Sequence, residues 1–197
     1  MQCKGGILEY GVFCLFTKNI TRRTFLHLVA AGAAALGSGR AAFAKSLFPN
    51  TGALTLFNYH TNDRLSITFR RPDGSYDLDG LHAINWIMRC HHTNQETIMD
   101  VNAIEYLNLV DKKLGGGNEI HIISGYRSPA YNSLLVQNGR HVAKQSLHRV
   151  GKAIDIAIPG IPLDKVRHTA VALRLGGVGY YPGAGFVHID SGKIRTW

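Results

Sequence analysis

Cysteine is scarce in this chain of 197 residues, which has only three. Cys3 and Cys14 lie near the N-terminus, in a segment that we interpret below as a removable export signal. That leaves Cys90, so the mature chain can form neither an intramolecular disulfide nor an iron–sulfur or cysteine-rich metal site. Cys90 lies in an apolar stretch and is expected to be a small buried thiol rather than a nucleophile. The fold must rest on its core, or on its core and a metal.

The chain also lacks an apolar run long enough to cross a membrane. The best candidate, residues 26–39, is about 15 residues long, whereas about 20 are needed to span hydrocarbon. It follows the paired arginines of residues 21–26 and precedes an A-x-A pattern at residues 42–44, which a signal peptidase could cut. These parts resemble a twin-arginine export signal, with a membrane anchor as the alternative. We expect residues 1–44 to be an N-terminal extension with this signal, and residues 45–197 to be the functional domain.

Acidic residues are fewer than basic ones. Five of the 22 Lys and Arg and one of the 13 Asp and Glu lie in residues 1–44, which leaves 17 basic against 12 acidic residues in the mature chain. A moderately basic exported domain suits an anionic polymer such as a cell wall, and nucleic acid would be in the wrong compartment. The excess is also ordinary for a soluble domain, so charge alone does not assign a function.

Hydrophobic periodicity predicts one compact α+β domain, with a small, mostly antiparallel sheet and flanking helices. No internal repeat or low-complexity segment interrupts it. Alternating apolar residues predict strands, and apolar residues spaced three to four apart predict helices. The expected strands are residues 54–59, 65–69, 120–123, 153–158, 178–181 and 186–190, and the expected helices are residues 81–89, 100–114, from 129 onward, and 163–175.

The most informative segment is SLHRVGKAID at residues 146–155. Side chains alternate faces along a strand, so Ile154, Ile156 and Ile158 share a core face. Asp155 then points to the other face between two alanines, where another group must approach closely. His148 lies on the loop just before this strand.

A second segment, FVHID at residues 186–190, shows the same alternation. His188 and Asp190 share the face opposite the apolar side chains, roughly 7 Å apart at the rise of a strand. Two histidines and one aspartate with an open fourth position are typical of catalytic zinc. Taken singly, His148, Asp155 and His188 also fit structural roles, as core histidines and a capping aspartate. Their combination on small-residue faces favours a metal site.

A third segment, SGYRS at residues 124–128, places Arg127 at a junction between a strand and a turn. A guanidinium there could bind a substrate carboxylate through two hydrogen bonds, or stabilise a developing oxyanion. An exposed turn residue or a structural ion pair is an equally good interpretation of Arg127 from spacing alone.

The S-x-H-x-x-G-x-A-x-D pattern at residues 146–155 resembles zinc peptidases of the D-Ala-D-Ala carboxypeptidase and hedgehog superfamily. The chain is more closely similar to one branch, the YcbK-like (MepK-like) murein endopeptidases. The resemblance covers nearly the whole mature chain. Its further segments are residues 54–56, 124–128, 142–148, 176–181, 186–190 and 195–197.

This resemblance implies a fold of the hedgehog and D-Ala-D-Ala peptidase type, with one zinc ion bound by His148, Asp155 and His188. It implies that Arg127 positions substrate or stabilises the transition state. The substrate would be the peptide stems and cross-links of peptidoglycan in the periplasm, with zinc polarising the scissile carbonyl and acidifying the attacking water. Contacts with the substrate are expected from Tyr126, Tyr180 and Tyr181.

The chain departs from its better-known relatives at the general base. They carry Glu or His two or three residues before the last zinc ligand, where this chain has Gly185 and Phe186. Asp190 is our candidate for the base, and orienting a metal ligand is its alternative role. Weaker candidates are His141, Tyr180 and Tyr181.

Three functions remain open at this point. The first is a zinc endopeptidase that cuts peptide cross-links of the wall. The second is a carboxypeptidase that trims the terminal D-amino acid of a stem, which differs in the carboxylate that Arg127 would meet. The third is a wall-binding module that keeps zinc but lacks turnover because the usual base is missing.

Overall fold

The computed structural model describes residues 51–139, 143 and 145–197. The expected export signal at residues 1–44 and the candidate base His141 lie outside these residues. In the described part of the chain, no helix has both the length and the apolar character that a membrane span requires. The helices are α2 (Leu78–Ile87), α3 (Val101–Lys113), α4 (Pro129–Gln137) and α5 (Leu163–Leu173), with two 3₁₀ turns, η1 (Leu147–Val150) and η2 (Pro182–Ala184).

A seven-stranded mixed sheet forms the framework, in the order β2-β1-β3-β4-β6-β5-β7. Four of its six strand pairs are antiparallel, and only β1–β3 and β5–β7 are parallel, which confirms the predicted α+β class. Its strands are β1 (Gly52–Asn58), β2 (Arg64–Arg70), β3 (Glu119–Ser124), β4 (Ala153–Ala157), β5 (Gly177–Tyr181), β6 (Phe186–Asp190) and β7 (Arg195–Thr196). All of these strands except β7 were expected. Strand β7 was missed because its two residues are too few for an alternating pattern to be recognised.

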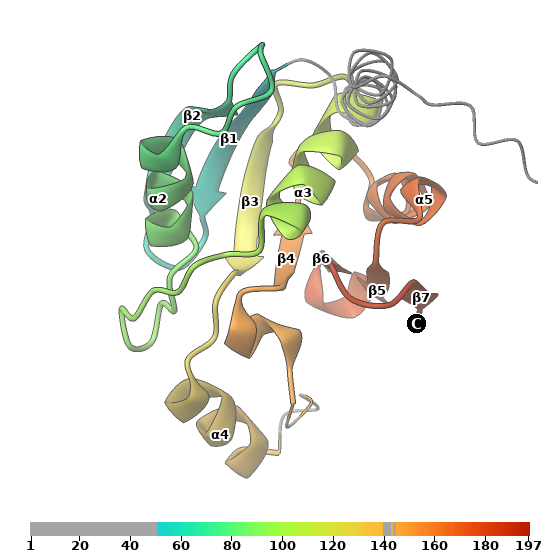
Figure 1. Ribbon diagram of the computed structural model, residues 1–197. Coiled ribbons are helices and arrows are strands. Elements are labelled where there is room, and N and C mark those ends of the chain that lie inside the picture. The colour runs from blue at the N-terminus through green and yellow to red at the C-terminus, as the bar shows by residue number, and fades with distance from the viewer. Residues whose placement is uncertain (1–50, 140–142, 144) are drawn as a thin grey trace, which may run out of the picture. The chain divides into compact units, whose positions relative to one another are not determined.

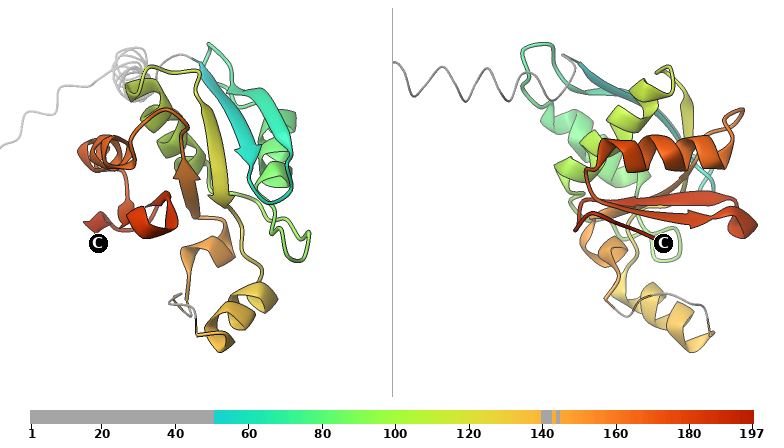
Figure 2. Two further views of the ribbon diagram at one scale, coloured as in Figure 1. Left: turned by 180° about the vertical axis from the view of Figure 1, so that it is seen from behind. Right: turned by 90° about the vertical axis from the view of Figure 1, so that its right-hand side faces the viewer.

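Helices α2, α3 and α5 cover one face of the sheet (Figures 1 and 2). They enclose a single apolar core, whose sheet side consists of alternate strand residues, as period-two alternation requires. These buried sheet residues are Leu54, Leu56, Ile120, Ile122, Ile154, Ile156, Val178, Val187 and Ile189.

Two helix boundaries differ from those expected by a few residues. Helix α2 begins at Leu78 rather than Leu81, because the carboxylate of Asp77 accepts a hydrogen bond from the backbone N–H of Gly80 at 3.1 Å. Helix α5 ends at Leu173 rather than Leu175, where Arg174 takes a left-handed conformation with φ of 53°.

One ion pair is buried beside this core. Arg70 at the end of β2 donates to Glu105 of α3, with Nε and Oε1 2.6 Å apart and both side chains almost fully shielded from solvent. A second contact joins Nη2 to Oε2 at 3.4 Å, so the guanidinium and the carboxylate meet in a two-pronged arrangement. This pair ties the first hairpin to α3.

The opposite face of the sheet differs between its two halves. Burial alternates along β1, whereas nearly every residue of β4 and β6 is buried. Both faces are therefore covered around β4 and β6. Helix α4 lies beyond the end of β3, away from the helical layer, and η1 leads the chain back into β4 (Figure 1).

Candidate metal centre

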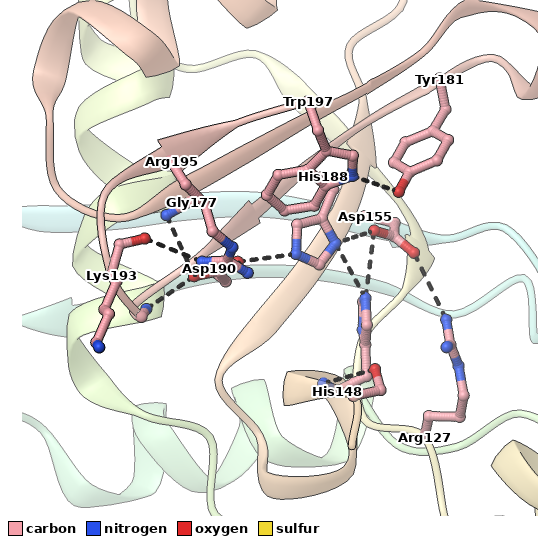
Figure 3. A network of polar contacts seen from close by, with 12 residues as sticks. Arg127, His148, Asp155, Gly177, Tyr181, His188, Asp190, Lys193, Arg195 and Trp197 are labelled. Carbon is pink, nitrogen blue, oxygen red and sulfur yellow. Dashed lines mark hydrogen bonds and ion pairs between the residues drawn. The ribbon is translucent and has the colours of Figure 1, made fainter. Parts of the chain in front are cut away.

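Strands β4 and β6 place an aspartate and a histidine side by side on the face that carries no helices. Asp155 of β4 and His188 of β6 are direct partners in the antiparallel register, so their side chains project from the same face at neighbouring points. His148 reaches the same point from η1. Figure 3 shows the three side chains pointing toward one another. The predicted convergence of His148, Asp155 and His188 thus agrees with the structure.

The short turn η1 positions His148 through its two ends. The hydroxyl of Ser146 caps the turn by accepting the backbone N–H of His148 at 3.4 Å. Gly151 ends the turn with φ of 67°, and a Cβ at this position would lie 2.6 Å from the carbonyl oxygen of Ile98. Only glycine satisfies both the left-handed backbone and this close approach. The Ser and Gly of the sequence pattern therefore set the position of the histidine between them.

The three donor atoms lie within bonding distance of one common point. His148 Nε2 is 3.2 Å from His188 Nδ1 and 3.3 Å from Asp155 Oδ1, and the last two atoms are 2.7 Å apart. Tetrahedral ligands at about 2.0–2.1 Å from zinc are separated by about 3.3 Å. Two of the three separations match that value, and the third is shorter. All three residues are buried.

Hydrogen bonds on the far side of each imidazole determine which nitrogen faces this point. His148 Nδ1 lies 2.7 Å from the carbonyl oxygen of Gly125, which can only accept, so Nδ1 carries the proton and Nε2 presents a lone pair. His188 Nε2 lies 3.1 Å from Asp190 Oδ2 and Nδ1 lies 2.7 Å from Asp155 Oδ1, so the tautomer of the neutral ring with its proton on Nε2 is the one that presents a lone pair on Nδ1. Two lone pairs and a carboxylate oxygen then face one another, an arrangement that fits a divalent cation.

The pKa values reflect this concentration of partners. Burial alone would raise the pKa of Asp155, but the imidazoles of His148 and His188 outweigh burial and hold that pKa well below its usual range. Burial opposes a charge on His188 as well, yet the hydrogen bonds that its ring donates to Asp155 and Asp190 raise its pKa above the ordinary value.

Asp190, our candidate base, lies behind His188 rather than beside the cavity. It is fully buried, and its oxygens accept from His188, from Arg195, and from the backbone N–H groups of Gly177 and Gly192. Burial raises the pKa of Asp190, but these hydrogen bonds hold it well below its usual range. The structure therefore supports the alternative role of Asp190, which is to orient a ligand.

Arg127 points its guanidinium toward the face that carries the three donor atoms, from the loop after β3 (Figure 3). Its Nη2 lies 3.8 Å from Asp155 Oδ2 and 3.4 Å from the hydroxyl of Ser124, and its backbone N–H donates to the carbonyl of His148. The side chain is buried, but its Nε has no hydrogen-bond partner within the described residues. This geometry leaves a positive donor available to a ligand, and it argues against the exposed turn residue of our alternative interpretation.

A cavity of about 200 Å³ opens onto the three donor atoms. Tyr181 lines it, as expected. Tyr126 and Tyr180 do not: Tyr180 shares a strand face with Val178 and packs against the core, and Tyr126 also packs there. We therefore no longer place these two tyrosines at the site. The lining residues are Arg127, Ala143, Gln145, Ser146, Leu147, His148, Asp155, Tyr181, Phe186, His188, Arg195 and Trp197.

Sequence reasoning missed Arg195 and Trp197 as members of the site. The indole of Trp197 lies 5.3 Å from the His188 ring and donates to the hydroxyl of Tyr181 at 2.6 Å. A Cβ on Gly179, the residue opposite His188, would come within 2.7 Å of that indole. Alternate glycines on the β5 face beside His188 were the available signal, because a strand face without side chains leaves room for a large ring.

Comparison with known proteins agrees with this geometry. The model of the family described as peptidoglycan L,D-endopeptidase MepK matches residues 47–197. The chain belongs to this family. A MepK relative in Haemophilus influenzae, named a probable peptidoglycan L,D-endopeptidase, is 43% identical over 150 residues, which are 76% of this chain and 80% of the relative. The MepK of Escherichia coli K12, named a peptidoglycan L,D-endopeptidase, is 38% identical over 173 residues, or 86% and 94% of the two chains. Membership of the MepK family confirms the resemblance recognised in the sequence.

Proposed function

We propose that this protein is a zinc-dependent peptidoglycan endopeptidase that hydrolyses amide bonds in the peptide cross-links of the cell wall. The observation that carries the proposal is the convergence of two imidazole nitrogens and one carboxylate oxygen, within 3.3 Å of one another, on the floor of a cavity. The names of the MepK relatives support the substrate class and the L,D type of bond.

His148, Asp155 and His188 would hold the ion, because their donor atoms already face one point. A bound zinc ion supplies Lewis acidity for the scissile carbonyl and lowers the pKa of a bound water. Three protein ligands would leave a fourth position for water or substrate, as in catalytic rather than structural zinc sites.

Arg127 would bind the substrate carbonyl or carboxylate. Its Nε, which has no partner in the part of the chain that the structure describes, and its position beside Asp155 support a hydrogen bond to the oxygen on which negative charge develops. Because the guanidinium is already in place and largely shielded from water, this interaction requires little reorganisation during the reaction. Tyr181, Phe186 and Trp197 would provide the apolar wall that excludes water around the bound peptide.

Asp190 would act as a positioning residue that keeps His188 in the ligating tautomer. Among the described lining residues, Asp155 is then the only carboxylate. The positions where better-known relatives carry their base are Gly185, which is exposed, and Phe186.

Digestion of purified cross-linked muropeptides, resolved by mass, tests this function. We expect the wild-type protein to cleave a cross-link, and His188→Ala to yield no product. His168→Ala is the matched control, because His168 is exposed on α5 and contacts none of the ligands. Release of a terminal D-amino acid by the wild type would indicate a carboxypeptidase instead. Binding of zinc and sacculi without any product would indicate a wall-binding module.

We also propose that the domain acts in the periplasm after export by the twin-arginine route. The support is the sequence of residues 1–44 and the wall-directed names of the relatives. Replacing both Arg22 and Arg23 by lysine should block export and keep the protein in the cytoplasm, as measured by cell fractionation. Unchanged export of this variant would contradict the twin-arginine route, while leaving the enzymatic proposal untouched.

A further inference from the structure

The carboxylate of Asp190 contacts the His188 ring on the side away from the three donor atoms. Asp190 is fully buried, and its Oδ2 contacts His188 Nε2 at 3.1 Å. The other oxygen, Oδ1, accepts from the backbone N–H of Gly177 at 3.2 Å and from that of Gly192 at 2.8 Å. The backbone therefore fixes one oxygen of Asp190, but not the oxygen that contacts the histidine.

Arg195 supplies the missing restraint. Its Nη2 donates to Asp190 Oδ2 at 2.7 Å, and its Nη1 donates to Oδ1 at 3.1 Å. Within the described residues, Oδ2 of Asp190 bonds only to this Nη2 and to His188 Nε2. A planar guanidinium that bonds both oxygens sets the plane of the carboxylate as well as its position. The orientation of the His188 ring thus depends on Arg195 through one shared oxygen.

Trp197 restrains the same ring from another side. Its indole lies 5.3 Å from the His188 ring, and the Arg195 guanidinium lies 4.7 Å above the indole. The indole is fixed in turn by its hydrogen bond to Tyr181 and by backbone hydrogen bonds of Trp197 with Val178 and Tyr180 on β5. Figure 3 shows Arg195 and Trp197 grouped around His188, on the side away from His148.

We propose that Arg195 and Trp197 form a positioning clamp that holds His188 with Nδ1 directed at the metal. Both residues come from β7 and the residue that follows it, so this short strand completes the metal centre. The inference rests on the metal centre proposed above, and it adds two residues that touch neither the metal nor the scissile bond. Loss of such an outer partner usually lowers metal affinity by about 10- to 100-fold.

Zinc affinity of the full-length protein, measured by competition with a chromogenic chelator, tests the clamp without relying on activity. We expect Arg195→Ala to bind zinc about 10- to 100-fold more weakly than the wild type. Arg195→Lys should recover only part of this loss, because one ammonium cannot bond both oxygens of Asp190 in a fixed plane. Lys193→Ala is the matched control: it removes a nearby exposed positive charge and should leave the affinity unchanged.

A second measurement separates positioning from general damage to the fold. Long-range ¹H–¹⁵N NMR spectra of the metal-free protein report which nitrogen of each histidine is protonated. At a pH where the ring is neutral, we expect Arg195→Ala to carry the His188 proton less on Nε2 and more on Nδ1 than the wild type does, because Asp190 is then free to turn away from Nε2. Trp197→Ala should show the same direction of change, with Trp197→Phe closer to the wild type because a ring remains.

The outcomes distinguish this inference from the proposed function. If the wild type binds no zinc, the metal centre itself is wrong. If the wild type binds zinc and Arg195→Ala binds equally tightly with an unchanged His188 tautomer, the clamp is wrong and the metal centre stands. If Arg195→Ala fails to fold, Arg195→Gln, which keeps the length of the side chain and loses the two-pronged charge, decides between the same results.

Discussion

Arg70 and Glu105 form one buried polar cluster of the domain, and His148, Asp155 and His188 form another. In the first, a positive and a negative group meet in a two-pronged arrangement, with Nε and Oε1 2.6 Å apart. In the second, two imidazole nitrogens and a carboxylate oxygen face one another, so electron pairs converge with no fixed positive charge between them. The charges of the first cluster balance as it stands, whereas a cation would complete the second cluster under the proposed function. By this difference, the Arg70–Glu105 ion pair is suited to supporting the fold, and the second cluster is suited to binding a cation.

The largest difference in activity between variants of the two clusters should come from removing the charge of Asp155. We expect Asp155→Asn to lower the rate of muropeptide cleavage by at least about 10³-fold, because the metal contributes several kcal/mol of transition-state stabilisation. Its effect on the free energy of unfolding should be smaller than that of Glu105→Gln in the other cluster, because an unpaired imidazole can release its proton near neutral pH. Cleavage at more than a tenth of the wild-type rate would contradict the assignment of Asp155 as a ligand.

The matching change is Glu105→Gln. It leaves the buried guanidinium of Arg70 without its countercharge, and a guanidinium cannot lose its proton in a protein. We expect a loss of about 3 kcal/mol in the free energy of unfolding, measured by denaturant titration, with little change in the rate per folded molecule. A variant as stable as the wild type, or one that is folded but inactive, would remove the distinction between the two clusters.

Removal of the metal should affect one cluster only. Zinc at about 100 times its dissociation constant should stabilise the wild type by about 2.7 kcal/mol over the chelated protein. The same increment is expected in Glu105→Gln and not in Asp155→Asn, measured by thermal unfolding with and without chelator. Equal stabilisation of all three proteins would place the ion elsewhere.

The smallest expected effect concerns His91, which has no carboxylate partner among the described residues. Burial and the positive charges of His60, His92 and Arg127 lower the pKa of His91 to about 4. The unfolded chain, with a histidine pKa of about 6.5, therefore binds more protons than the folded one between these values, so stability should fall as the pH drops from 6.5 toward 4. His91→Gln should flatten this slope in denaturant titrations at several pH values. An unchanged slope would mean that His91 is not the group responsible.

The sequence was sufficient to predict most of the sheet and the convergence of His148, Asp155 and His188. Alternation alone separated Ile154 and Ile156 from Asp155, and Val187 and Ile189 from His188, because a strand with one core face leaves no other arrangement. The same alternation would have placed Tyr180 with Val178 on the core face. Our prediction instead placed Tyr180 at the substrate together with Tyr181, because it assigned neighbouring tyrosines together rather than by the face that each occupies.

Other parts of the site depend on contacts between distant segments, which one sequence does not display. The hydrogen bond from His148 to the carbonyl of Gly125 joins a turn to a loop 23 residues away. The role of Asp190 could not be decided either, since an acid two residues from a ligand can face the substrate or sit behind the ligand. Its burial and its contact with Arg195 became visible only in the folded chain.

Strand β7 has a second consequence, which concerns the association of molecules rather than the chemistry of one. It occupies the end of the sheet order beside β5, and it pairs with only two residues there. Exposed strand edges present unpaired N–H and C=O groups to which a strand of another molecule can add, and very short terminal strands are one way of preventing this. A variant that detaches β7 would uncover the edge of β5 and should aggregate at concentrations at which the intact protein remains monodisperse.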